Sequence, residues 1–278
     1  MTYLLGLIGY PIKHSLSPWI HGQFMDKTDL KGSYEIFEIS LEEDFKTKIN
    51  QLKNKNVNGF NVTIPYKERI IEELDELDEQ AQKIGAVNTV LNKDGKLIGY
   101  NTDGLGYVKS LENAYPSIKQ TQPKILLLGA GGAARGIYNG LKSCGYETID
   151  IANRTLEKAE KIKATNLLGK TKVITLDTAE QILNEYDIVI QTTSVGMKPY
   201  VDHQIIKLNN LKANVIISDI VYQPIMTQFL KDAKAQGAQI HTGHTMLLYQ
   251  AELAFNLWTD KQVEVEDMDS KLQTILEG

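Results

Sequence analysis

The sequence predicts an α/β fold in two domains. Segments with the apolar patterns of short strands and of helices alternate along almost the whole chain, which is typical of parallel sheets with crossover helices. The length of 278 residues exceeds the usual size of a single hydrophobic core. A glycine-rich segment also separates a strand-like run from a helix-like run near the middle of the chain, which favours a doubly wound second half.

The first domain, residues 1–101, is predicted to be a mostly parallel α/β domain. Strands are expected at 4–8, 34–39, 59–64, 87–91 and 96–100, with helices at 18–27, 42–53 and 66–84. The segment from Asn92 to Gly95 carries an Asp-Gly turn signal, so the last two strands should form an antiparallel hairpin. The acidic run 72–79 is interpreted as the solvated face of the third helix.

The second domain, residues 102–242, repeats the alternation. Strands are expected at 124–128, 148–152, 172–175, 187–192, 215–220 and 239–241, with helices at 133–143, 156–168, 179–185 and 227–236. The first of these helices should end at Cys144 and Gly145, because glycine readily takes the left-handed conformation that closes a helix. A helical pattern at 244–258 follows, and residues 243–278 are expected to rejoin the first domain.

Composition excludes several classes of partner. The apolar fraction of 42% and the charged fraction of 23% are those of an ordinary globular protein. A net charge of −5 offers no basic surface for nucleic acid or an anionic membrane. The single cysteine, Cys144, cannot form an intramolecular disulfide, which fits a reducing compartment. No apolar run has the length of a membrane span and the amino terminus lacks a basic signal region, so a cytoplasmic protein is expected.

Two short segments predict an active site. Residues 59–67 and 99–104 each read as a strand that ends among amide or hydroxyl side chains and then delivers an ionisable residue, Lys67 or Asp103. Such a pair suits a polyhydroxylated substrate whose hydroxyl gains or loses a proton. Taken singly, Lys67 could instead lie in the first turn of a helix and Asp103 could be a helix N-cap.

The glycine-rich segment predicts a dinucleotide site. Gly129, Gly131 and Ala134 follow a strand and open a helix, where glycine permits a tight turn and lets a pyrophosphate approach the positive helix end. This context favours a Rossmann-type nucleotide-binding domain over a glycine turn without a ligand. The candidate contacts are Gly129, Ala130, Gly131, Gly132 and Ala133.

The end of the next strand indicates NADP rather than NAD. An acidic residue there would bind the ribose 2′-hydroxyl of NAD, whereas this chain has Asn153, Arg154 and Thr155, with Lys158 one helical turn further on. The nearest acid, Asp150, lies inside the strand. Arg154 could alternatively be an ordinary exposed arginine in a turn.

Several motifs in the same order resemble those of shikimate dehydrogenases, and the resemblance covers most of the chain. The matching segments are 9–18, 61–67, 85–89, 101–104, 129–135, 153–155, 192–197, 219–224 and 243–250. The resemblance implies reversible reduction of 3-dehydroshikimate to shikimate with NADPH, in a cleft between a substrate domain and an NADP domain. It also implies a monomer or a homodimer.

The resemblance also implies roles for particular residues. Ser15 and Ser17, with Tyr222, would hold the substrate carboxylate, and Lys67 and Asp103 would be the catalytic pair. The ring hydroxyls would be bound by Asn61, Thr63, Asn88 and Gln250, and the nicotinamide would lie near Thr192, Ser194, Gly243 and Met246.

Three departures from the family pattern leave fine cofactor contacts open. Gln191 stands where the family usually has Asn, Thr242 where it often has Asp, and Gly22 where it often has Asn. Being longer, Gln191 is expected to reposition its loop slightly.

Some readings compete with these assignments. The two serines could be helix caps. None of the five histidines has the carboxylate or cysteine neighbours of a metal site, so no metal is expected. A quinate/shikimate dehydrogenase using NAD and a non-catalytic NADP sensor are the alternative functions; Arg154 disfavours the first, and the presence of both Lys67 and Asp103 disfavours the second.

Overall fold

The computed structural model describes residues 2–166 and 169–278 and contains two compact units. The first unit consists of Met1–Thr102 with Gln250–Val265, and the second of Asp103–Tyr249 with Glu266–Gly278. The carboxyl-terminal tail is therefore shared between the two units. The assignment of substrate binding to 1–101 with 243–278, and of NADP binding to 102–242, stays a prediction.

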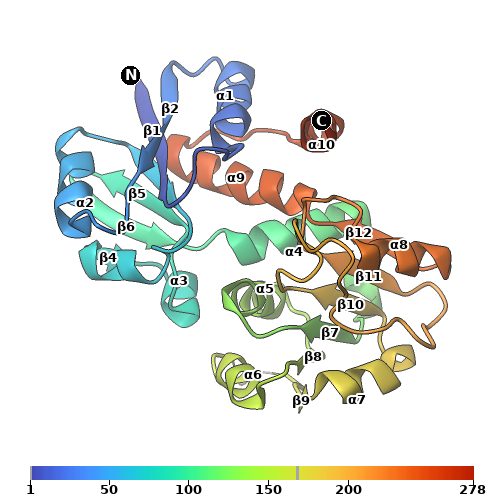
Figure 1. Cartoon of the computed structure of the whole chain (residues 1–278). Coiled ribbons are helices and arrows are strands. Elements are labelled where there is room, and N and C mark those ends of the chain that lie inside the picture. The colour runs from blue at the N-terminus through green and yellow to red at the C-terminus, as the bar shows by residue number, and fades with distance from the viewer. Residues whose placement is uncertain (1, 167–168) are drawn as a thin grey trace. The chain divides into compact units, whose positions relative to one another are not determined.

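The first unit is built on a mixed six-stranded sheet (Figure 1). Strand β5 runs antiparallel to both of its neighbours, and the other pairs are parallel. The hairpin between β5 and β6 is confirmed, with Asp94 and Gly95 at positive φ in its turn. The strand order is β2 (Gly32–Glu38), β1 (Tyr3–Gly9), β3 (Gly59–Val62), β5 (Thr89–Lys93), β6 (Lys96–Tyr100) and β4 (Glu76–Leu77).

Helices α1 (Ser17–Lys27) and α2 (Phe45–Asn54) are where the sequence predicts them, but the long helix at 66–84 is wrong. That segment forms a 3₁₀ turn (Arg69–Glu73), strand β4 and a short helix α3 (Glu79–Ile84). Two acidic residues of the run 72–79 interrupt the expected helix. Asp75 accepts from the Leu97 N–H at 2.8 Å, and Asp78 caps α3 by accepting from the Ala81 N–H at 2.8 Å. Asp75 and Asp78 thus bind backbone N–H groups, and the interpretation of the run as one face of a single helix is wrong.

The second unit is built on a fully parallel six-stranded sheet. The sheet is doubly wound, because β7 and β10 are neighbours and the chain proceeds outward from them in opposite directions. Ligands in such folds bind outside the carboxyl ends of the strands at this switch point. The order is β12 (Gln239–Thr242), β11 (Ile216–Asp219), β10 (Ile188–Gln191), β7 (Ile125–Leu128), β8 (Ile149–Ala152) and β9 (Val173–Ile174).

Helices cover both faces of this sheet. Helix α5 ends as predicted, with Cys144 at its C-cap and Gly145 at φ 91°. The predicted helix 156–168 corresponds to α6, and residues 167 and 168 lie outside the described residues. Helices α4 and α10 are additional to the predicted set. The helices are α4 (Asp103–Ala114), α5 (Gly132–Ser143), α6 (Leu156–Lys163), α7 (Leu176–Gln181), α8 (Gln228–Ala235), α9 (His244–Thr259) and α10 (Asp269–Glu277), with 3₁₀ turns at Ile118–Thr121, Leu183–Glu185 and Glu266–Met268.

Strands β7, β8, β10 and β11 of the second unit are buried along their whole length. In β7, Ile125 and Leu127 belong to one buried cluster, and Leu126 and Leu128 belong to another. A continuous apolar run is the expected pattern for a parallel strand covered on both sides. Among residues 2–166 and 169–278, no helix combines the length and the apolar character needed to cross a membrane.

Helices α4 and α5 approach closely at two glycines (Figure 1). A Cβ atom at Gly104 would lie 2.1 Å from the carbonyl oxygen of Gly136, and one at Gly140 would lie 2.5 Å from the carbonyl carbon of Gly104. No side chain fits at either position. Asp103 is the first residue of α4. The close contact between α4 and α5 therefore fixes its position relative to the helix that follows the glycine-rich segment.

Candidate functional site

The turn between β7 and α5 has the shape of a phosphate site. Gly129 has φ 112°, and a Cβ there would lie 2.5 Å from the Thr193 methyl group. At Gly131 and Gly132, by contrast, an added Cβ would meet nothing within 4 Å. The first turn of α5 therefore opens onto free space, and its Gly131 N-cap supplies no side-chain hydrogen bond. The unsatisfied N–H groups of such a turn suit a pyrophosphate. Ala130 packs against the core beneath, and Ala133 lies in the first turn of α5.

The segment after β8 presents cationic side chains. Asn153 folds its amide back to the Thr155 carbonyl at 2.8 Å, and the side chains of Arg154 and Lys158 are exposed. Asp150 is buried in the strand, where it accepts from the Lys172 N–H and the Tyr186 hydroxyl. Asp150 therefore cannot replace the missing acid at the strand end. The residues present fit a 2′-phosphate better than a ribose hydroxyl.

The predicted nicotinamide residues lie beyond the carboxyl ends of two strands, β10 and β12, and at the start of α9. Thr192 follows β10 and donates its hydroxyl to the Leu128 carbonyl of β7 at 2.8 Å, and Ser194 is exposed in the same loop. Gly243 follows β12, and a Cβ there would lie 2.3 Å from the Ile220 carbonyl oxygen. Met246, one turn into α9, packs partly against the core. Thr192 and Gly243 thus follow different strands at the same end of one sheet.

A buried network joins two of these loops. Gln191 accepts hydrogen bonds from the Thr193 backbone N–H and hydroxyl, and its amide donates to the Val195 carbonyl (3.0 Å) and to Asp219 (3.1 Å). Asp219 also accepts from the Thr227 hydroxyl at 2.7 Å and from the backbone N–H of Val221 at 2.9 Å. The long Gln191 side chain therefore anchors its loop to β11. Burial raises the pKa of Asp219 to about 6, which its three hydrogen bonds oppose.

The raised pKa makes the free energy of unfolding depend on pH. The unfolded aspartate loses its proton near pH 3.8, while the folded one keeps it to about pH 6. Between these values the folded state binds more protons, so the contribution of Asp219 to stability should fall as pH rises and stay level above pH 6. Relative to Asp219→Asn, we expect a loss of about 3 kcal/mol across this window. Urea unfolding of both proteins checks it, and parallel pH curves would contradict it.

The serines of the predicted carboxylate loop are not helix caps. Helix α1 begins at Ser17, its N-cap is Leu16, and that cap makes no side-chain hydrogen bond. The Ser15 hydroxyl instead donates to the Ser17 hydroxyl and accepts from the Ser17 N–H, both at 3.2 Å. The loop thus holds two hydroxyl groups side by side, as binding of a carboxylate would require.

Three of the residues predicted to bind ring hydroxyls lie in or next to the central strands β3 and β5 of the first sheet. Asn61 on β3 donates to the Asn88 carbonyl and to the Thr89 hydroxyl, both at 3.2 Å. Asn88 accepts from the Thr102 N–H at 2.8 Å and donates to the Thr102 hydroxyl at 3.0 Å. Thr63 follows β3 and joins β1 through its N–H to the Ile8 carbonyl. The structure therefore brings Asn61 and Asn88 into one hydrogen-bonded group.

Four other predicted residues are placed as follows. Lys67 is half-buried just after β3, and its carbonyl accepts from the Val87 N–H at 2.7 Å. Asp103 is the first residue of α4, so these two residues belong to different units. Gln250 lies in α9 within the returning segment of the first unit, and Tyr222 lies after β11 with 39% of its surface exposed. In the described part of the chain, His, Cys, Asp and Glu form no group that could hold a metal ion.

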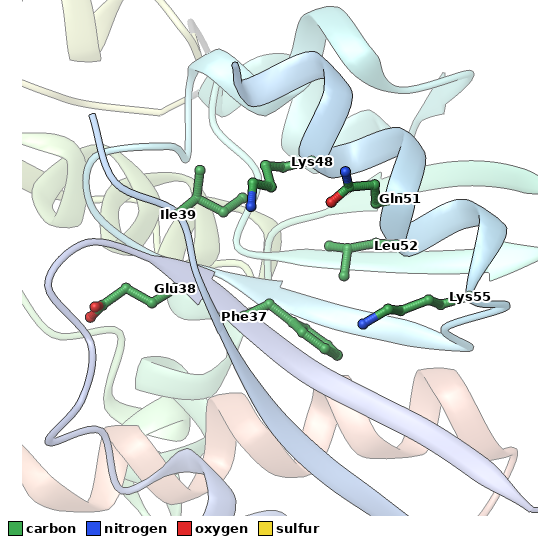
Figure 2. Close-up of a pocket in the computed structure, with 7 residues that line it drawn as sticks. All are labelled: Phe37, Glu38, Ile39, Lys48, Gln51, Leu52 and Lys55. Carbon is green, nitrogen blue, oxygen red and sulfur yellow. The ribbon is translucent and has the colours of Figure 1, made fainter. Parts of the chain in front are cut away.

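A cavity of about 140 Å³ lies between β2 and α2 (Figure 2). None of its lining residues is among the predicted ones. They are Phe37, Glu38, Ile39, Lys48, Gln51, Leu52 and Lys55. Glu38 contacts the predicted carboxylate loop from below, since it accepts from the Ile12 N–H at 2.9 Å.

Comparison with known proteins supplies the family. Residues 7–90 match the model of the shikimate dehydrogenase substrate binding domain, and residues 112–221 match that of shikimate / quinate 5-dehydrogenase. Residues 243–273 match the shikimate 5′-dehydrogenase C-terminal domain. A shikimate dehydrogenase (NADP(+)) from Oceanobacillus iheyensis is 52% identical over 100% of both chains. The chain belongs to the shikimate dehydrogenase family.

Solved structures of similar proteins have the same fold as this chain. The shikimate 5-dehydrogenase of Thermus thermophilus in complex with NADP(H) and shikimate has a TM-score of 0.87 and 31% identity, covering 98% of this chain and 99% of its own. The quinate dehydrogenase of Corynebacterium glutamicum in complex with NAD has a TM-score of 0.89 and 28% identity, covering 100% and 99%. The fold alone therefore does not decide between the two dinucleotides.

Two of the departures from the family pattern can be placed in the structure. Gln191 holds its loop through four hydrogen bonds, and the expected repositioning of that loop stays a prediction. A Cβ at Gly22 would meet nothing within 4 Å, so the chain could carry a side chain there without a clash. Sequence reasoning missed Tyr34, whose hydroxyl donates to Asn61 at 2.7 Å. A tyrosine in an alternating strand carries no signal of that contact.

Proposed function

We propose that this protein catalyses the reversible NADPH-dependent reduction of 3-dehydroshikimate to shikimate. The observation that carries the proposal is membership of the shikimate dehydrogenase family over the whole chain, with both Lys67 and Asp103 present in the family's motifs. The cationic segment after β8 supports NADP as the dinucleotide, because Arg154 and Lys158 suit a 2′-phosphate.

The substrate is bound by the first unit together with Tyr222. Ser15 and Ser17 receive the carboxylate, supported by the paired hydroxyls of the loop before α1. Asn61, Thr63, Asn88 and Gln250 bind the ring hydroxyls. Amide and hydroxyl groups of this kind discriminate strongly against an analogue that lacks a hydroxyl, because their buried polar atoms would then remain unpaired.

The proton is handled by Lys67 and Asp103 acting as a pair. When bound, NADPH supplies a hydride to the ketone carbon, and the ketone oxygen must gain a proton as that carbon is reduced. The Lys67 ammonium stabilises the developing oxyanion, and the pair delivers the proton. The proton is therefore assigned to the pair rather than to one residue.

Turnover of shikimate with NADP by the purified protein tests the proposal. We expect activity at ordinary enzyme concentration, with NADP preferred to NAD and shikimate preferred to quinate. Equal or better use of NAD and quinate would favour the quinate/shikimate alternative. Absence of turnover despite tight NADP binding would favour a non-catalytic sensor.

Removal of both loop hydroxyls should weaken substrate binding. Ser15→Ala combined with Ser17→Ala should chiefly raise KM for shikimate, by roughly tenfold or more, because two hydrogen bonds to a charged group are lost. KM for NADP should not change. Steady-state kinetics with each substrate varied in turn measures both constants, and unaltered shikimate kinetics would exclude a role in carboxylate binding.

The proposal also includes a cellular location and an oligomeric state. The protein works in the cytoplasm, which a single cysteine without a disulfide supports. It acts as a monomer or a homodimer, and sedimentation velocity of the purified protein distinguishes the two.

A further inference from the structure

Tyr34 is joined to one of the predicted substrate residues, because its hydroxyl donates to Asn61 Oδ1 at 2.7 Å. Burial raises the pKa of Tyr34, and the nearby Ser17 hydroxyl opposes that shift. Ser17 is in turn joined to Ser15 at 3.2 Å. All four residues belong to the first unit.

The hydrogen bonds fix which way the Asn61 amide points. Its Nδ2 atom donates to the Asn88 carbonyl and to the Thr89 hydroxyl, while Oδ1 accepts from Tyr34. A reversed amide would set an oxygen against the Asn88 carbonyl, which can only accept. An amide has two N–H groups and two acceptor positions on its oxygen. Both N–H groups are used, so the remaining capacity of Asn61 is one acceptor position.

The ring of Tyr34 is held in place by an aromatic cluster. It stacks on His21 with ring centroids 4.4 Å apart and planes 4° apart, and Phe24, Phe255 and Trp258 surround the histidine. His21 is fully buried, and within the described residues neither of its ring nitrogens has a hydrogen-bond partner. Burial lowers the pKa of His21 to about 3, so the ring is neutral. His21 therefore contributes a flat ring on which the Tyr34 ring stacks.

We propose that Tyr34 is a positioning residue of the substrate site, which holds Asn61 as a hydrogen-bond acceptor for one ring hydroxyl of the substrate. The inference rests on the proposed function, since it deepens the account of the same site. Tyr34 acts through Asn61 and does not itself touch the reacting atoms. His21 keeps the tyrosine ring from turning, so that its hydroxyl stays directed at the amide.

Tyr34→Phe tests the hydroxyl while keeping the stacked ring. It should raise KM for shikimate about three- to tenfold, the size expected for one net hydrogen bond, and leave kcat within about twofold and KM for NADP unchanged. In an Asn61→Ala background the same substitution should have almost no further effect, because its target is gone. A residue that only stabilised the fold would not show this dependence.

Tyr146→Phe is a matched control from the second unit. Tyr146 is also buried, and its hydroxyl donates to Glu112 at 3.0 Å. Its loss should lower the melting temperature by an amount similar to that of Tyr34→Phe. Both Michaelis constants should remain those of the wild type.

A second pair of variants tests whether the His21 ring supports the Tyr34 ring, and it leaves the Tyr34 hydroxyl in place. His21→Ala leaves a void under the Tyr34 ring and should raise KM for shikimate, while His21→Phe restores a flat ring and should return KM toward the wild-type value. The histidine makes no hydrogen bond to a described residue that phenylalanine would lose. This pair remains informative if Tyr34→Phe does not fold.

The outcomes separate this inference from the proposed function. A wild-type protein that does not turn over shikimate would overturn the proposed function. Normal wild-type turnover with an unchanged shikimate KM in Tyr34→Phe, or with independent losses in the Tyr34→Phe, Asn61→Ala double variant, would overturn the positioning role alone. An equal KM in His21→Ala and His21→Phe would overturn the supporting role of the stack.

Discussion

Lys67→Ala should lower kcat by about 10²–10⁴-fold, the usual scale for loss of a general acid–base group. The substitution removes the ammonium that is proposed to stabilise the developing oxyanion, and we expect the fold and NADP affinity to stay largely intact. Single-turnover rates, thermal melting and NADP titration measure the three quantities. Lys83→Ala is a suitable control, because Lys83 pairs only with Glu79 on the surface of the same unit among the described residues. Near-wild-type turnover in Lys67→Ala would refute a catalytic role.

Asp103→Asn tests the other member of the pair. The asparagine keeps the shape and removes the charge, so turnover should fall and the pH dependence of kcat should change. Because the two groups act as a unit, the double variant should lose much less than the product of the single losses. Strictly multiplicative losses would show that Lys67 and Asp103 work independently.

Arg154→Ala should weaken NADP binding by roughly ten- to a hundredfold and leave NAD binding nearly unchanged. The estimate follows from a hydrogen bond to a charged group, which contributes on the order of 1.5–3 kcal/mol. Titration of each dinucleotide against both proteins gives the dissociation constants. Lys163→Ala, at the carboxyl end of helix α6 and paired with Glu160, should leave both affinities unaltered. Equal losses for the two dinucleotides would remove the basis for assigning NADP specificity to this segment.

The strand pattern could be predicted from the sequence because buried parallel strands are short apolar runs bounded by turn signals. The segment 66–84 shows the limit of such reasoning. Its spacing suits a helix, but Asp75 and Asp78 bind backbone N–H groups of other residues and divide it into three elements. A carboxylate that accepts from a distant backbone group has the same sequence signature as one that faces water. Tertiary hydrogen bonds therefore decided what the local pattern could not.

The same limit applies to the candidate site. Residues in loops after strands, such as Ser15 and Arg154, could be proposed because polar side chains at those positions have few structural uses. Tyr34 lies within a strand, where a tyrosine is an ordinary residue. Its contact with Asn61 joins positions 27 residues apart, and only the strand order of the first sheet brings them together. The assignment of roles to the predicted residues remains to be tested by the variants described above.

The close crossing of α4 and α5 has a consequence for recombining this protein with its relatives. Gly104 and Gly140 leave no room for side chains where α4 and α5 cross. A chimaera should therefore take α4 and the dinucleotide turn from the same parent protein. A chimaera joined at Thr102 would transfer Asp103 with the nucleotide unit and leave Lys67 behind. A join after Ala114 would instead pair α4 from one parent with α5 from another, and would succeed only where both parents carry glycine at the crossing. The boundary at Thr102 is thus the safer place for exchanging cofactor specificity.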